Sequence, residues 1–288
     1  MRILKYFFEF IFIIAFFIIF KILGYKIATD LGEFIGKRLG PFFRSNDKII
    51  KNLENSKIGN TEKDREMITK NMWGNYGRIL AEYMFIKEFR KNINNFSANL
   101  EIVGQNNLEE ISKNKNPVIF VSGHFNNFEL MAMHLEKSGI DVAAIYRPLN
   151  NIFLNPLMEK IRKKYICKKQ IKKGMSGTKE ILKQFKNGTS IALMIDQRVS
   201  EGLSSNFFYR KAFTTTIPAQ FVKKFNCNVV PVYIERIKKH QFRLEVFKPI
   251  KFSKNEKIET ITLNLNQIIE NMIKRNPDQW IWTHNRWK

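Results

Sequence analysis

Short apolar runs alternate with helical stretches over the last two thirds of the chain. Runs typical of buried strands occur at 100–103, 118–121, 142–145, 190–195 and 229–234. Helical periodicity occurs at 125–138, 153–165, 176–186 and 257–275. Residues 242–247 follow a KKHQ turn and are typical of an antiparallel strand. Alternating strands and helices predict an α/β fold, a single layered domain with a mixed, largely parallel central sheet flanked by helices.

The N-terminus carries a long apolar stretch, ILKYFFEFIFIIAFFIIFKIL, at residues 3–23. About 20 mostly apolar residues can cross a bilayer. Lys5 and Lys21, near its two ends, can extend to the lipid headgroups. The following GYKIATD is a poor signal-peptidase site, so an uncleaved membrane anchor over 1–24 is expected, with a helix lying in the membrane interface as the alternative.

Basic residues follow the apolar stretch closely: Lys21, Lys26, Lys37, Arg38, Arg44 and Lys48. By the positive-inside rule, the bulk of the protein then faces the cytoplasm. We expect an anchor (1–24) and one further domain (25–288), with a helical part over 25–95 and an α/β part over 96–288. Within the helical part, the pattern predicts one helix before Pro41, a polar loop over 46–63 and a core-facing helix over 67–84.

The formal net charge of +23 calls for an acidic partner, which could be nucleic acid, an anionic lipid surface or an acidic protein. An AT-rich genome would also enrich lysine without selection on charge. The apolar N-terminus favours the membrane, and no nucleic-acid reading motif is present. The two cysteines, Cys167 and Cys227, form no C-x-x-C pair, which fits a reducing compartment and excludes a cysteine-rich metal module.

A histidine and a glutamate lie at the junction of a predicted strand and helix. Residues 117–139 read PVIFVSGHFNNFELMAMHLEKSG, with His124 five positions before Glu129. Side chains at i and i+5 lie about 140° apart on a helix, so only a turn at Ser122-Gly123 could bring the two together. The pattern predicts a histidine held by a carboxylate, an arrangement typical of general-base catalysis. A helix-capping histidine is the alternative.

Other chemistries lack their motifs in this chain. No Ser lies in G-x-S-x-G, which disfavours a covalent enzyme intermediate. No H-E-x-x-H is present, which disfavours zinc.

Several blocks in order resemble the late acyltransferases of lipid A biosynthesis, the lauroyl/myristoyl transferase family within the His-x4-Asp/Glu glycerolipid acyltransferases. The blocks are SGHFNNFELM, AIYRPLNN, ALMIDQ with FF and AFTTT beyond it, VVPVYIER and NPDQWIWTHNRWK. The resemblance covers the whole chain. One departure is FFYRKA in place of FFG-x-P-A, where Tyr209 and Lys211 replace Gly and Pro.

The resemblance implies transfer of an acyl chain from acyl carrier protein to a hydroxyl of a lipid A precursor, at the cytoplasmic face of the inner membrane and without a cofactor or metal. His124 would be the base and Glu129 its orienting partner. The implied substrate-binding residues are Arg147, Asp196, Gln197, Asn126 and Asn127, and His284 and Arg286 would lie next to the site.

Two other functions stay open from the sequence. One is the same chemistry on a different acceptor, such as a lysophospholipid or a glycolipid. The other is a basic membrane-surface binding protein without catalysis.

A basic segment contains Lys160, Arg162, Lys163, Lys164, Lys168, Lys169, Lys172 and Lys173. It could bind acidic acyl carrier protein, anionic lipid or substrate phosphates, or it could be a solvated surface.

Overall fold

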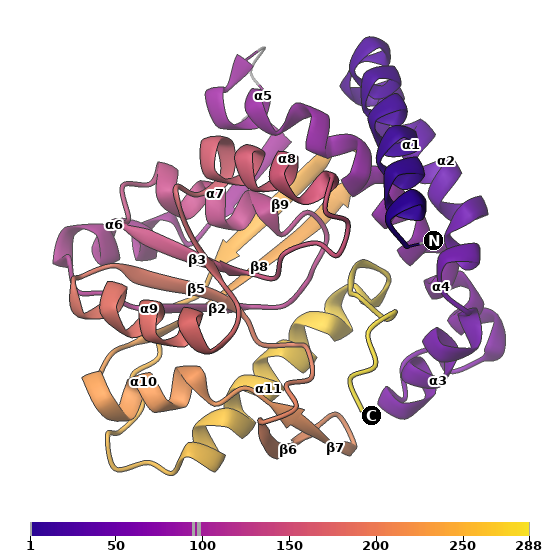
Figure 1. The fold of residues 1–288 in the computed structure, drawn as a ribbon. Helices are drawn as coiled ribbons and strands as arrows, with labels where there is room; N and C mark the ends of the chain where they lie inside the picture. Colours follow the sequence, from indigo (N-terminus) through magenta and orange to yellow (C-terminus); the bar gives the residue numbers. More distant parts are fainter. Residues whose placement is uncertain (1, 94–95, 97–98, 288) are drawn as a thin grey trace.

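The computed structural model describes residues 2–93, 96 and 99–287 of the 288-residue chain (Figure 1). Within these residues the central sheet has seven strands in the order β1-β9-β8-β2-β5-β3-β4. The strands are β1 (Leu100–Val103), β2 (Ile119–Ser122), β3 (Val142–Tyr146), β4 (Lys169–Lys172), β5 (Ser190–Met194), β8 (Val229–Lys238) and β9 (Gln241–Val246). The predicted α/β fold class is confirmed.

The middle of the sheet is parallel. β2 pairs in parallel with β5 and β8, and β5 is followed by β3 and then β4 in the same direction. β9 runs antiparallel to β8 and carries β1 on its outer edge. The expected antiparallel strand after the KKHQ turn is therefore confirmed as β9. All residues of β2 are buried, as its continuous apolar sequence predicts for a central parallel strand.

Helices cover the sheet from two sides. In Figure 1, α7 (Glu129–Lys137) and α8 (Leu154–Ile161) lie above it, while α10 (Ile217–Phe225) and α11 (Ile258–Arg275) lie below. The remaining helices of this part are α6 (Gln105–Asn114) and α9 (Met175–Lys186), and a small antiparallel hairpin, β6 (Leu203–Phe207) with β7 (Arg210–Thr214), packs against α11.

The N-terminal part is helical and precedes the first strand. It contains α1 (Arg2–Leu23), α2 (Tyr25–Phe43), α3 (Asn46–Ser56), α4 (Glu62–Glu82) and α5 (Ile86–Lys91). Among the described residues, one helix, at Ile3–Leu23, is long and apolar enough to cross a membrane. The expected division at 95/96 falls beside Asn95, which lies outside the described residues, as do Met1 and Lys288, so the division stays a prediction.

Glycines bring α2 and α4 into backbone contact. A Cβ added at Gly36 would lie 2.2 Å from the carbonyl oxygen of Trp73, and one at Gly32 would lie 2.4 Å from that of Gly77. The four-residue spacing from Gly32 to Gly36 places both on one face of α2. This close packing fixes α4, which carries several side chains that contact the site.

Two local predictions for the helical part are wrong. The stretch expected as a loop contains α3, because Ser45 caps its N-terminus and Ile49 and Leu53 bury an apolar face despite the polar composition. Helix α2 does not end before Pro41 but continues to Phe43. β4, the β6–β7 hairpin and α10 were not predicted.

Candidate active site

Four side chains follow the ends of four neighbouring parallel strands. His124 comes after β2, Asp196 after β5, Arg147 after β3 and Lys173 after β4. Because β2, β5, β3 and β4 are adjacent and parallel, their carboxyl ends meet at one edge of the sheet. Ligands of open α/β sheets bind at this edge. The topology thus brings three of the predicted site residues, and one unpredicted lysine, to a common edge.

His124 is hydrogen-bonded to Asp196. The His124 Nδ1 atom lies 2.8 Å from Asp196 Oδ1, and the backbone N–H of His124 donates to Oδ2 at 2.8 Å. The indole N–H of Trp280 also donates to Oδ2 at 2.8 Å. Asp196 is fully buried, whereas the His124 side chain is 22% exposed. The carboxylate therefore fixes the ring from inside the protein and leaves part of it open to a substrate.

The ionisation of Asp196 follows from these contacts. Burial would raise the pKa of the Asp196 carboxyl, but the charge and hydrogen bonds of His124 and the Trp280 N–H outweigh burial and lower that pKa to about 2. Asp196 is thus a carboxylate at neutral pH. With Nδ1–H donating to a carboxylate, the neutral His124 ring carries its lone pair on Nε2 and can accept a proton there.

Glu129 binds other partners than the expected histidine. It accepts hydrogen bonds from the Tyr83 hydroxyl and from Arg162 Nε, the latter at 2.8 Å. Arg162 also donates to the Tyr83 oxygen at 3.2 Å. The expected turn is present, since β2 ends at Ser122 and α7 begins at Glu129. The correction concerns the partner: the carboxylate hydrogen-bonded to His124 is Asp196.

The physical reason lies in the loop between β2 and α7. Asn126 in this loop has a left-handed backbone (φ 41°), and the ring of Phe128 packs edge-on against His124 at 5.0 Å. His124 therefore points across the sheet edge to β5. Glu129, on the first turn of α7, faces the 3-10 turn Tyr83–Phe85 that follows α4 and a π-helical turn at Arg162–Ile166. Single π-helical turns often occur at functional sites.

The Glu129 cluster, defined as Glu129, Tyr83 and Arg162, is largely buried. The side chains of Arg162 and Glu129 are 12% and 9% exposed. Burial and the neighbouring Glu129 carboxylate raise the pKa of Tyr83 well above its usual value, so the phenol stays protonated. Burial would lower the pKa of Arg162, but its pairing with Glu129 and Tyr83 raises it. The cluster is a stable ion pair with a neutral phenol.

Asn126 and Asn127 are buried and hydrogen-bonded within the protein. The Asn126 amide donates to Asn75 and to Gln279, both at 3.0 Å, and its oxygen accepts from Arg236. The Asn127 amide donates to Glu82 at 2.9 Å. These contacts hold the His124 loop against α4 and the C-terminal segment.

The C-terminal residues also reach the site. His284 Nε2 accepts a hydrogen bond from the backbone N–H of Arg198 at 3.0 Å, two residues after Asp196. Burial lowers the pKa of His284 to about 4, with the Asp196 charge opposing this effect, so the ring is neutral at pH 7. Gln197 follows Asp196 and is half-buried.

Arg286 is fully buried behind the hairpin. It donates to the Phe213 carbonyl at 2.8 Å and to the Thr214 hydroxyl at 2.6 Å, and its guanidinium lies over the Phe207 ring. Burial lowers the pKa of Arg286 to about 10. These contacts tie the C-terminal segment to β6 and β7.

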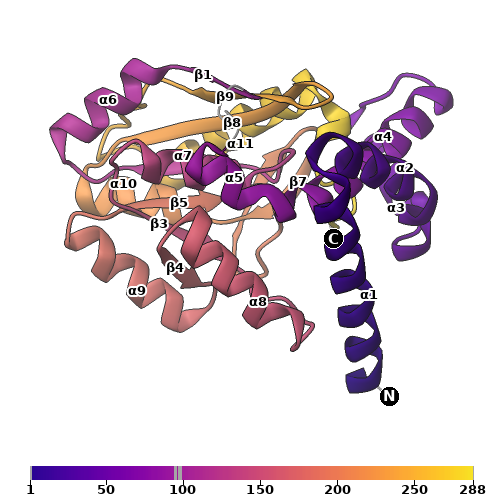
Figure 2. The same ribbon diagram turned by 90° about the horizontal axis from the view of Figure 1, so that it is seen from above.

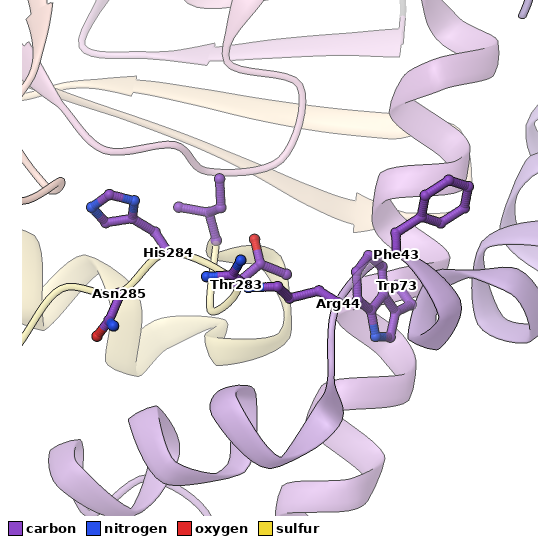
Figure 3. A pocket seen from close by; sticks show the side chains of 7 residues that line it. Phe43, Arg44, Trp73, Thr283, His284 and Asn285 are labelled. Atoms are coloured by element: carbon purple, nitrogen blue, oxygen red, sulfur yellow. The ribbon is translucent and has the colours of Figure 1, made fainter. Parts of the chain in front are cut away.

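A pocket of about 520 Å³ lies beside His284, between the C-terminal segment and the helical part (Figure 3). Its lining is mixed apolar and polar and consists of Phe43, Arg44, Trp73, Ile281, Thr283, His284 and Asn285. Figure 3 shows His284 and Asn285 on one side and Arg44, Trp73 and Phe43 on the other. Elements far apart in sequence thus form a hollow next to the histidine that neighbours Asp196.

Sequence reasoning missed four residues of this region. Arg162 and Lys173 were noted only as members of a basic segment, and Tyr83 only as a core residue. Trp280 lay in a recognised block but had no assigned role. Lys173 could have been found if KQIK had been identified as a strand, since Lys173 directly follows that strand.

Among the described residues, no group of three or more His, Cys, Asp or Glu side chains is placed to hold a metal ion.

Comparison with known proteins identifies the family of this chain. Residues 1–288 match the model of the family described as bacterial lipid A biosynthesis acyltransferase. The chain is 22% identical over 259 residues to the lipid A biosynthesis myristoyltransferase of Escherichia coli strain K12, covering 89% of this chain and 78% of that protein. It is 24% identical over 233 residues to lipid A biosynthesis acyltransferase 2 of Shigella flexneri, covering 77% and 71%.

Among solved structures, the 1-acyl-sn-glycerophosphate acyltransferase of Thermotoga maritima aligns with a TM-score of 0.39 and 13% identity, over 89% of this chain and 98% of that one. The family match spans the whole chain and confirms the resemblance stated from the sequence blocks. The chain belongs to the bacterial lipid A biosynthesis acyltransferases.

Proposed function

We propose that this protein transfers an acyl chain from acyl carrier protein to a hydroxyl of a lipid A precursor, at the cytoplasmic face of the inner membrane. The observation that carries the proposal is the His124–Asp196 pair at the carboxyl edge of the parallel strands. Its buried carboxylate and partly open imidazole suit general-base activation of a hydroxyl.

In the proposed mechanism, His124 Nε2 removes the proton from the acceptor hydroxyl as its oxygen attacks the thioester carbonyl. Asp196, on Nδ1, stabilises the imidazolium that forms. The tetrahedral intermediate collapses, the C–S bond breaks, and the thiol sulfur takes the proton from the imidazolium. The products are the ester and the free thiol of the carrier, and His124 returns to its neutral form.

In this proposal Asp196 takes the orienting role that the sequence assigned to Glu129. Glu129 instead positions Arg162, whose guanidinium also lies 5.8 Å from the centre of the Tyr146 ring at the end of β3. In this proposal Glu129 holds Arg162 in place and does not contact the reacting atoms.

Arg147 and Lys173 are proposed to bind an acceptor phosphate. Arg147 and Lys173 directly follow paired positions of the neighbouring parallel strands β3 and β4. Burial and the positive charge of Arg147 lower the pKa of Lys173, with the Asp196 charge opposing. Two neighbouring cations repel each other, and an anion bound between them offsets this repulsion. A phosphate on the sugar would satisfy both and would bring the hydroxyl towards His124.

The test is an acylation assay on washed membranes that contain the protein. Acyl carrier protein loaded with lauroyl, myristoyl or palmitoyl chains would be supplied with an under-acylated lipid A precursor, and mass spectrometry would detect one added chain. The proposal expects a gain that disappears with His124→Ala. Acylation of lysophospholipids alone would show that the acceptor is a lysophospholipid and not a lipid A precursor. No acylation of any acceptor would contradict the proposed activity.

A further inference from the structure

Helix α1 contacts the rest of the protein near both of its ends (Figure 2). Towards its C-terminus, Lys21 pairs with Glu88 and donates to the Met84 carbonyl at 3.2 Å. Phe17 and Phe20 on the same part of the helix are buried.

Near its N-terminus, α1 is held by the connection between β3 and α8. The Asn151 amide donates to the Tyr6 carbonyl at 2.8 Å and to Glu9 at 3.3 Å. The Phe153 ring packs against those of Phe7 and Phe10, with centroids 5.7 and 6.1 Å apart.

These two sets of contacts lie far apart along the helix axis. At 1.5 Å per residue, Tyr6 lies about 22 Å from Lys21. If α1 crossed the bilayer with the catalytic domain beyond its C-terminus, Asn151 would have to lie about 22 Å deep in a hydrocarbon core about 30 Å thick. The connection at 147–153 could extend only about 12 Å out and back from the ends of β3 and α8. The observed contacts therefore conflict with a spanning helix.

We propose that α1 does not cross the membrane but enters a single leaflet together with the 147–153 connection, so that both ends of α1 stay on the side of the catalytic domain. The occupant of its free face is the acyl-chain layer of an anionic lipid leaflet. This inference rests on the contacts of α1 and is independent of the acyl-transfer reaction.

The surfaces on either side of this contact suit such a leaflet. The free face of α1 is apolar, with exposed side chains at Ile3, Leu4, Phe8, Ile11, Phe12, Ile18, Ile19 and Ile22. The 147–153 connection adds Ile152, which is 56% exposed. Lys5 and Lys21 lie near opposite ends of α1 and have side chains 72% and 49% exposed. In a helix lying in the interface, both lysines can reach anionic headgroups of the same leaflet.

Disulfide trapping in native membranes tests the contact. Glu9→Cys combined with Asn151→Cys, and separately Phe7→Cys with Phe153→Cys, would be oxidised with copper phenanthroline and mapped by mass spectrometry. The proposal expects an intramolecular disulfide in both pairs. Glu9→Cys with Ser253→Cys, an exposed position far along the chain, is the control that should remain unlinked. The native cysteines, Cys167 and Cys227, are buried and should not compete.

Topology labelling gives the second readout. A membrane-impermeant maleimide should label Lys5→Cys, at the headgroup level, in inside-out vesicles together with Ser253→Cys, and should leave both unlabelled in intact spheroplasts. Labelling of Lys5→Cys from the periplasmic side would overturn the proposal. If Lys5→Cys is shielded on both sides, the trapping decides: pairs that link in detergent but not in membranes would overturn the proposal as well. Acylation assayed in the same membranes reports separately on the reaction.

Discussion

Two carboxylates lie on either side of the loop after β2, and they bind different groups. Asp196 comes from β5, is fully buried and holds the partly exposed His124. Glu129 comes from α7, only five positions after His124, and holds Arg162 and Tyr83. The carboxylate close in sequence thus binds an arginine and a tyrosine, and the one distant in sequence binds the histidine ring.

This difference separates two ways in which an acidic residue can support catalysis. A carboxylate on the histidine acts on the proton transfer itself, because its charge stabilises the imidazolium. A carboxylate on a buried arginine acts through position, because without it the guanidinium would be buried and unpaired. The first role predicts changes in the pH–rate profile, and the second predicts changes in stability.

The largest effect is expected for His124→Ala. Removal of the proposed base should lower kcat by about 10³- to 10⁴-fold. It should also lower the unfolding temperature, because the buried Asp196 carboxylate loses its hydrogen bond to the ring and keeps those from Trp280 and the backbone. Acylation kinetics on purified protein in detergent would measure the change in kcat. His134→Gln, on α7 and outside the site, is the matched control and should stay within about 2-fold of the parent. Equal losses in the two variants would indicate a general folding defect.

Asp196→Asn should have the next largest effect. The amide keeps the shape but removes the charge opposite the imidazolium, so kcat should fall by about 10²- to 10³-fold. The acidic limb of the pH–rate profile should also move to lower pH, because the protonated ring loses its counter-charge. If neither kcat nor the acidic limb of the pH–rate profile changes, Asp196 has no part in the mechanism, and Glu129 would again be the candidate for the orienting role.

Glu129→Gln should lower kcat less, by about 10-fold, and leave the shape of the pH–rate profile unchanged. Its main effect should be on stability, since Arg162 loses its charged partner inside the protein. Thermal unfolding and kinetics on the same preparation would separate the two effects.

The same helix offers a matched control for that variant. Glu136→Gln breaks the Arg90–Glu136 pair between α5 and α7 and should lower stability without the loss of kcat. If Glu129→Gln moves the acidic limb as far as Asp196→Asn does, the two carboxylates share one role and the comparison is wrong.

The sequence was sufficient for the parallel strands and the histidine but not for the partner of the histidine. β2 and β5 were predictable because continuous apolar runs indicate central strands. β4 was not, because KQIK at the sheet edge has only one fully buried residue. The bond between His124 and Asp196 joins residues 72 positions apart, and local spacing cannot encode such a contact. It follows from the order β2-β5, which the packing of the whole sheet determines.

The smallest effect is expected from the protonation of His134 and concerns the stability of the protein. Burial lowers the pKa of His134 from 6.5 to about 4, with the Lys137 charge adding to the effect. The folded state therefore favours the neutral ring, and the stability it contributes is complete above pH 6.5 and decreases as the pH falls towards 4.

Between pH 7 and pH 5, His134 alone should cost at most about 2 kcal/mol of unfolding free energy. Urea unfolding of the parent and of His134→Gln at both pH values would measure this difference. The variant should lose less stability on acidification, because glutamine does not titrate. Asp196, with its pKa near 2, stays ionised across this range. Acid sensitivity above pH 5 would then come from buried histidines and not from protonation of Asp196. If the parent and the variant have identical pH dependence, the pKa of His134 is the same in the folded and the unfolded state. The acid response would then be assigned to His284.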